Sequence, residues 1–186
     1  MELLSFYLEL HENGYQRVMT KTYNLSNLTI LIIEDSQHMR QIIRTVLRGF
    51  GIHRIHDVAD PAEAFEIFRT TQIDVIIVDY KLPTLDGIEF VQLVRGAKDS
   101  TNPYVPIIML SAYTSKKVII EARDAGITEF LGKPISAKNL YLCLISCVEK
   151  PRDFVRAPNY FGPERRRQNS SNYRGPERRK QNATIR

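Results

Sequence analysis

Cysteine is scarce in this chain of 186 residues, which contains only Cys143 and Cys147. The two are four residues apart on a predicted amphipathic helix, so they share one face and do not point at each other. A disulfide between them is therefore not expected. We interpret both as core thiols of a protein in a reducing compartment.

Long apolar runs are missing as well. No segment approaches the 18 consecutive apolar residues that indicate a membrane-spanning helix. The amino terminus lacks a basic start and carries Glu2, Glu9 and Glu12 among its apolar residues, which is not the pattern of a signal peptide. The sequence therefore predicts a cytoplasmic protein.

Positive charge is sparse in the body of the chain and concentrated at its end. Residues 1–149 contain 15 Lys and Arg against 18 Asp and Glu, a net charge of −3. Residues 150–186 contain 11 and 3, a net charge of +8. Such a basic tail indicates an anionic partner, although a solvated basic end is the alternative. With few large aliphatic side chains, the tail is expected to be disordered when free.

Five short apolar runs alternate with helical patterns in the body. The second helix begins with Asp60-Pro61, an N-cap followed by proline at the first helical position. Five such units predict an α/β fold, a doubly wound five-stranded parallel sheet covered on both faces, over residues 27–149. The expected strands are 28–33, 52–59, 73–78, 105–110 and 127–131.

Residues 1–26 form an amino-terminal extension whose structure is harder to predict. One alternative is a helix, and the other is a loose segment. Met19 begins a segment that leads into the first predicted strand and is an alternative start of translation. The helix would carry the apolar residues Leu3, Leu4, Tyr7, Leu8 and Leu10.

Polar side chains follow the predicted strands at the point where each strand ends. Glu34-Asp35 and Asp79 end two strands, and Ser111 and Lys133 end two others. In an open parallel sheet the functional crevice lies beyond the carboxyl ends of the strands, so these residues are expected to converge there. Carboxylates with one lysine and one hydroxyl indicate Mg²⁺-assisted phosphoryl chemistry.

The body resembles the receiver domain of bacterial two-component response regulators, specifically the single-domain chemotaxis regulators with a flavodoxin-like fold. This resemblance covers about residues 27–149. It depends on the joint spacing of several short motifs. These are Glu34-Asp35, Asp79, Pro83, Gly87, Ser111-Ala112, Phe130 and Lys133-Pro134.

The resemblance implies a role for each of these residues. Asp79 would be the nucleophile that accepts a phosphoryl group as an acyl phosphate. Lys133 would pair with Asp79 at rest and with a phosphate oxygen afterwards, and its bond to Pro134 would be cis. Ser111 and Phe130 would form the switch pair that responds to phosphorylation. Mg²⁺ would be bound by Glu34, through water, and by Asp35, Asp79 and the backbone carbonyl of Lys81.

The same resemblance implies phosphorelay signalling by a phosphoacceptor rather than an enzyme. A sensor histidine kinase, a phosphotransfer protein or a small phosphodonor would supply the phosphoryl group. The tail lacks the length and apolar pattern of a DNA-binding domain.

A sequence motif is duplicated in the tail. Tyr160-Phe161-Gly162-Pro163-Glu164-Arg165-Arg166-Arg167 recurs 13 residues later as Tyr173-Arg174-Gly175-Pro176-Glu177-Arg178-Arg179-Lys180. Guanidinium groups bind phosphates bidentately and stack on bases, and aromatic rings add stacking surfaces. The expected ligand-binding residues are Arg152, Arg156, Tyr160, Arg165, Arg166, Arg167, Tyr173, Arg174, Arg178 and Arg179.

The tail resembles the arginine-rich extension of chemotaxis-regulator-like cyclic di-GMP effectors of alphaproteobacteria. This implies cyclic di-GMP as a ligand and a protein partner such as the flagellar motor switch. The alternative is a docking protein that acts without phosphorylation and whose tail binds RNA or another anionic surface.

Overall fold

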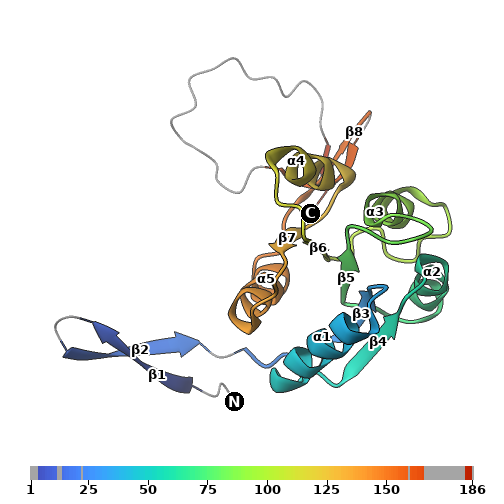
Figure 1. The fold of residues 1–186 in the computed structure, drawn as a ribbon. Coiled ribbons are helices and arrows are strands. Elements are labelled where there is room, and N and C mark those ends of the chain that lie inside the picture. Colours follow the sequence, from blue (N-terminus) through green and yellow to red (C-terminus); the bar gives the residue numbers. More distant parts are fainter. Residues whose placement is uncertain (1–3, 12–13, 22, 159, 166–182, 186) are drawn as a thin grey trace.

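The structure is a computed structural model that describes residues 4–11, 14–21, 23–158, 160–165 and 183–185. Its centre is a parallel sheet of five strands in the order β4-β3-β5-β6-β7 (Figure 1). Each strand lies within or beside one of the predicted apolar runs, so the predicted fold class is confirmed. The strands are β3 (Thr29–Ile33), β4 (Arg54–Val58), β5 (Val75–Asp79), β6 (Ile107–Ser111) and β7 (Glu129–Gly132).

Five helices connect and flank these strands. The core is divided into two clusters, one on each face of the sheet. Helices α1 and α5 pack on one face through residues such as Leu47 and Leu144, and α2, α3 and α4 pack on the other. The helices are α1 (Gln37–Gly49), α2 (Pro61–Thr70), α3 (Gly87–Gly96), α4 (Lys116–Ala125) and α5 (Ala137–Glu149).

Side-chain caps mark the starts of the helices, including the one predicted start. Asp60 accepts hydrogen bonds from the backbone N–H groups of Ala62 and Glu63, which confirms the predicted start of α2. Asp86 and Glu89 form a reciprocal capping box at the start of α3. Local sequence chemistry therefore determines where these helices begin.

The amino-terminal extension contains a β-hairpin, so both alternatives for this segment, a helix and a loose segment, are wrong. Strand β1 (Leu4–His11) pairs antiparallel with β2 (Gly14–Lys21). Apolar residues occur at every second position from Leu4 to Leu10, and Asn13-Gly14 is a strong hairpin signal. The apolar residues of this segment fit both a strand period of two and a helical period, and the observed strands follow the period of two.

The described part of the tail contains a small sheet, which differs from the expectation of a wholly disordered segment. Strands β8 (Phe154–Ala157), β9 (Tyr160–Pro163) and β10 (Ala183–Ile185) form an antiparallel sheet in the order β10-β8-β9. The β8–β9 hairpin lies against α3 and α4. The ring centroids of Phe154 and Phe161 lie 5.0 and 5.4 Å from that of Tyr104. The segment needs no core of its own because it extends the core of the body.

Arg95 is buried beneath this hairpin at the amino-terminal end of β6 and β7. Its guanidinium donates hydrogen bonds to the carbonyl oxygens of Pro103, Val105 and Gly126, at 2.8–3.0 Å. It also lies 5.2 Å from the ring centroid of Phe154. Burial lowers the pKa of Arg95 to about 9, so the side chain is still a cation at neutral pH.

Candidate functional site

The predicted polar residues converge at the carboxyl end of the sheet. Asp79 and Ser111 are the last residues of β5 and β6, and Glu34-Asp35 and Lys133 directly follow β3 and β7. Parallel pairing aligns these strand ends at one edge. Residues separated by up to 99 positions in sequence are therefore neighbours.

Lys133 bridges two buried carboxylates. Its Nζ lies 2.7 Å from Oε2 of Glu34 and 2.8 Å from Oδ1 of Asp79. Glu34 is 2% exposed and Asp79 is 6% exposed. The predicted pairing of Lys133 with Asp79 is thus present, and Glu34 is a second partner that the sequence did not indicate.

The pKa values reflect crowding of like charges around one cation. The pKa of Glu34 is raised, mainly because the carboxyl group is buried. The hydrogen bond from Lys133 lowers this pKa and the negative charge of Asp79 raises it further, and the net shift is upward. Burial alone would lower the pKa of Lys133, but its bonds to Asp79 and Glu34 outweigh burial and raise it. At neutral pH the lysine is therefore charged and compensates only part of the negative charge.

Glu34, Asp35 and Asp79 offer carboxylate oxygens that all lie within 4.8 Å of one another. Hard oxygen donors of this kind fit Mg²⁺, which retains several water ligands in proteins. Asp35 is exposed and leaves room for such water, whereas Glu34 and Asp79 are buried. These residues would hold the ion. The part predicted for the backbone carbonyl of Lys81 stays a prediction.

The hydroxyl of Ser111 is engaged with its own loop. It donates to the carbonyl of Tyr113 at 3.0 Å and accepts from the N–H of Tyr113 at 2.9 Å. Phe130 is half-buried against the core cluster beneath α2, α3 and α4. Both predicted switch residues are therefore placed beside the site, and their movement stays a prediction.

Gly87 and the bond between Lys133 and Pro134 shape the site. A Cβ atom at Gly87 would lie 2.2 Å from the carbonyl oxygen of Asp79, so only glycine allows α3 to start so close to this residue. The Lys133–Pro134 peptide is cis, which confirms the prediction.

Sequence reasoning missed Arg40. Its Nη1 donates to the carbonyl of Glu34 at 2.6 Å and to that of Asp35 at 3.1 Å. It therefore helps to hold the turn that carries two of the three carboxylates. An arginine one turn into the helix after an acidic pair is a weak signal, and none of the motifs used above includes it.

The predicted tail residues that the structure describes lie away from this edge, at the opposite end of β6 and β7. Arg152 donates to the carbonyl oxygens of Thr128 and Glu164. The guanidinium of Arg156 lies 4.4 Å from the ring centroid of Phe161, and that of Arg165 lies 3.9 Å from that of Tyr160. The other predicted tail residues, Arg166, Arg167, Tyr173, Arg174, Arg178 and Arg179, lie outside the described residues.

Comparison with known proteins agrees with this geometry. The family described as "Response regulator receiver domain" matches residues 30–144. The chain belongs to this family. The chemotaxis protein CheY-3 of Vibrio cholerae is 29% identical over 114 residues, 61% of this chain and 86% of the relative. CheY of Pseudomonas aeruginosa is 30% identical over 113 residues, 61% of this chain and 90% of the relative.

Solved receiver structures have the same fold. Vibrio cholerae CheY4 has a TM-score of 0.57 at 32% identity and covers 63% of this chain and 95% of its own. The receiver domain of the sensor histidine kinase PA1611 from Pseudomonas aeruginosa has a TM-score of 0.57 at 29% identity, with 63% and 94% covered. That domain was solved with a magnesium ion coordinated in its active-site cleft.

Among the described residues, no helix has the length and apolar character needed to cross a membrane.

Proposed function

We propose that this receiver accepts a phosphoryl group on Asp79. The observation that carries the proposal is the bridge from Lys133 to Glu34 and Asp79 at the carboxyl edge of the sheet. An oxygen of the Asp79 carboxylate attacks phosphorus, the bond from phosphorus to the donor breaks, and the donor leaves with that electron pair. Lys133 neutralises charge on the transferring group. Mg²⁺, when bound by the carboxylates, supplies further charge neutralisation.

Ser111 links this chemistry to conformation. To donate to a phosphoryl oxygen, its hydroxyl must release the carbonyl of Tyr113, to which it now donates. Phe130 then takes the space that Ser111 leaves, and the surface near α4 and β7 changes. The equilibrium between the two arrangements is biased by the phosphoryl group.

The test is labelling of the full chain by acetyl phosphate with Mg²⁺, measured as the mass of the intact protein. Asp79→Asn is expected to abolish labelling because the amide is not a nucleophile of comparable strength. Asp99→Asn, a change of equal charge at an exposed residue, is the matched control and should label like the wild type. Labelling that persists in Asp79→Asn and disappears on changing another residue would refute the assignment.

The phosphoryl donor in the cell is proposed to be a sensor histidine kinase or a phosphotransfer protein. The family assignment supports this class of partner. The identity of the kinase, like the cytoplasmic location, stays a prediction.

A second candidate function concerns the tail, for which we propose binding of cyclic di-GMP and control of a partner such as the flagellar motor. The stacked pairs Arg156–Phe161 and Arg165–Tyr160 support it, because guanidinium groups held on aromatic rings suit a ligand with phosphates and planar bases. Calorimetric titration of the full chain with cyclic di-GMP tests it.

The matched variants remove arginines inside and outside the tail. Replacing Arg165, Arg166, Arg178 and Arg179 by alanine should remove binding, whereas Arg69→Ala with Arg123→Ala should retain it. Tight binding of single-stranded RNA or acidic vesicles with no binding of cyclic di-GMP would favour the alternative of a phosphorylation-independent docking protein.

A further inference from the structure

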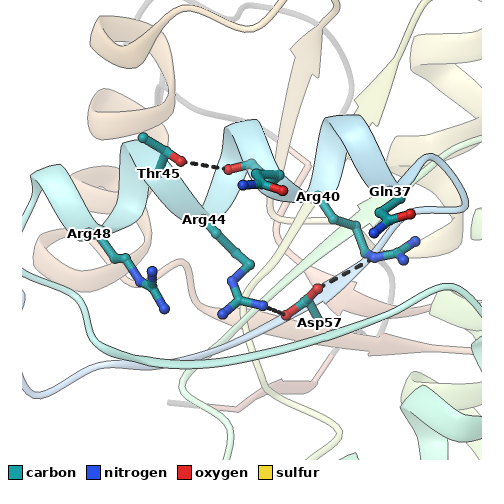
Figure 2. A pocket seen from close by; sticks show the side chains of 7 residues that line it. Gln37, Arg40, Arg44, Thr45, Arg48 and Asp57 are labelled. Carbon is teal, nitrogen blue, oxygen red and sulfur yellow. Dashed lines mark hydrogen bonds and ion pairs between the residues drawn. The ribbon is translucent and has the colours of Figure 1, made fainter.

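A polar groove of about 280 Å³ lies between α1 and β4, and no described tail residue lines it. Three arginines of α1, Arg40, Arg44 and Arg48, line it (Figure 2). They are four residues apart, so they share one face of the helix, with a rise of about 6 Å from each to the next. The groove thus presents a row of guanidinium groups.

The residues that line the groove have more positive than negative charge. Its single carboxylate, Asp57, lies between two of the arginines (Figure 2). The carboxylate oxygens are 3.4 Å from Nε of Arg40 and 2.6 Å from Nη1 of Arg44. The side chain of Arg48 has no hydrogen bond or ion pair with any residue in the described part of the chain. Three cations and one anion leave an excess of two positive charges in a body whose net charge is −3.

We propose that this groove binds an oligophosphate, a chain of two or three linked phosphate groups, either free or as part of a nucleotide. Guanidinium forks match phosphate oxygens bidentately, and a row of forks suits linked anionic groups better than a single carboxylate. No aromatic residue lines the groove. The groove therefore recognises the phosphate chain and not a base.

Asp57 prepares the groove for this ligand. By fixing Arg40 and Arg44 it removes part of the side-chain entropy that binding would otherwise cost. The remaining N–H groups of Arg44 and those of Arg48 are the ones available to the ligand.

Arg40 connects the groove to the acidic edge of the sheet. The same guanidinium that contacts Asp57 donates to the carbonyl oxygens of Glu34 and Asp35. An anion held by Arg44 and Arg48 would also attract the charge of Arg40, and a shift of that guanidinium would move the backbone of this acidic turn. Binding in the groove would therefore affect the position of Glu34, which pairs with Lys133.

The experiment is titration of the full chain with inorganic triphosphate in the absence of Mg²⁺, followed by NMR of arginine Nε–H groups and backbone amides. Signals of Arg44 and Arg48 are expected to shift with the same midpoint as the amides of Asp35 and Ser36. In Arg44→Gln/Arg48→Gln the dissociation constant should rise at least about tenfold, because charge-assisted hydrogen bonds are lost.

The control must account for the basic tail, which also attracts anions. Arg69→Gln/Arg123→Gln removes the same charge from exposed sites outside the groove and tail. It should change the dissociation constant by less than about twofold, as expected for distant charges screened by salt. Arg48→Gln alone removes no side-chain hydrogen bond or ion pair within the described fold and should still weaken binding.

Equal weakening in the groove and control variants would overturn the proposal. So would binding of adenosine triphosphate without binding of inorganic triphosphate, because a base would then be recognised. Binding of single-stranded RNA at the groove with no binding of triphosphate would also overturn it. Similar affinities for inorganic triphosphate and adenosine triphosphate would support recognition of the phosphate chain alone.

Discussion

At the carboxyl end of the sheet, two of three clustered carboxylates pair with one lysine, whereas at the amino end a single buried arginine lies among carbonyl oxygens and aromatic rings. Within the described part of the chain, the ion-pair partners of Lys133 are Glu34 and Asp79, and the cluster retains negative charge. Arg95 has no carboxylate partner in the described residues, yet three carbonyl dipoles accept its N–H groups.

This difference in charge compensation indicates that the carboxyl end is a binding site and that Arg95 at the amino end has a structural role. Excess charge of one sign remains available to a ligand of opposite sign, so the carboxyl end suits Mg²⁺ and a phosphoryl group. In Arg95 the Nε and Nη1 groups donate to carbonyl oxygens, and Nη2 is buried without a hydrogen-bond partner in the described residues. The β8–β9 hairpin covers this guanidinium, so it is not open to a ligand from solvent. We therefore expect the two ends to respond differently to mutation.

Arg95→Ala gives the largest expected effect on stability. It leaves the carbonyl oxygens of Pro103, Val105 and Gly126 without their donors, so the free energy of unfolding should fall by about 3 kcal/mol. Urea unfolding measures this, and acetyl phosphate labelling of Asp79 should be unchanged. Arg69→Ala, at an exposed ion pair, is the control and should cost less than about 0.5 kcal/mol. A large loss of labelling in folded Arg95→Ala would break the comparison.

Phe154→Ala tests whether the hairpin is part of the folded body. Phe154 is buried against Tyr104, Phe161 and Arg95, so its truncation should lower the free energy of unfolding by about 2 kcal/mol. Leu142→Ala, on the exposed surface of α5, is the matched control and should have a much smaller effect. If both variants unfold like the wild type, the hairpin contributes nothing to the stability of the body.

Asp79→Asn should stabilise the metal-free protein at neutral pH, by an amount on the order of 1 kcal/mol, because it removes repulsion with Glu34 while Lys133 keeps its ion pair with Glu34 and so stays compensated. The folded-state pKa of Glu34 is raised, so the charged form costs stability above that pKa. The cost vanishes below the unfolded value near 4.5. The gain should therefore shrink as pH falls through the raised pKa. Thermal unfolding in EDTA from neutral to acidic pH measures it, and a less stable variant at neutral pH would contradict the prediction.

The smallest expected effect concerns the lifetime of the phosphoryl group. Lys81 and Tyr113 are exposed beside Asp79 and Ser111, and the ring centroids of Tyr113 and Tyr80 are 6.4 Å apart. Such side chains hinder the approach of water, so Lys81→Asn/Tyr113→Ala should lose its phosphoryl group several-fold faster than the wild type. Dephosphorylation after removal of the donor measures this. Lys98→Asn is the control, and an unchanged or slower rate in the double variant would count against shielding.

Much of the fold and site could be predicted from local sequence. Apolar runs and helical periods located all five strands and helices of the body, and the polar residues that end the strands identified Glu34, Asp79 and Lys133. The amino-terminal hairpin also had a local signal, in its alternation and in Asn13-Gly14, although the helical alternative obscured it.

By itself, therefore, the sequence determined the order of elements, their caps and the residues delivered to the carboxyl edge, because these depend on periodicity and chain direction. Only the tertiary structure decided which charges are compensated. The burial of Arg95, the docking of Phe154 on Tyr104 and the meeting of Asp57 with Arg40 and Arg44 each join separate elements. Such contacts depend on how elements pack in three dimensions, and a charged residue leaves no periodic signal that names its partner.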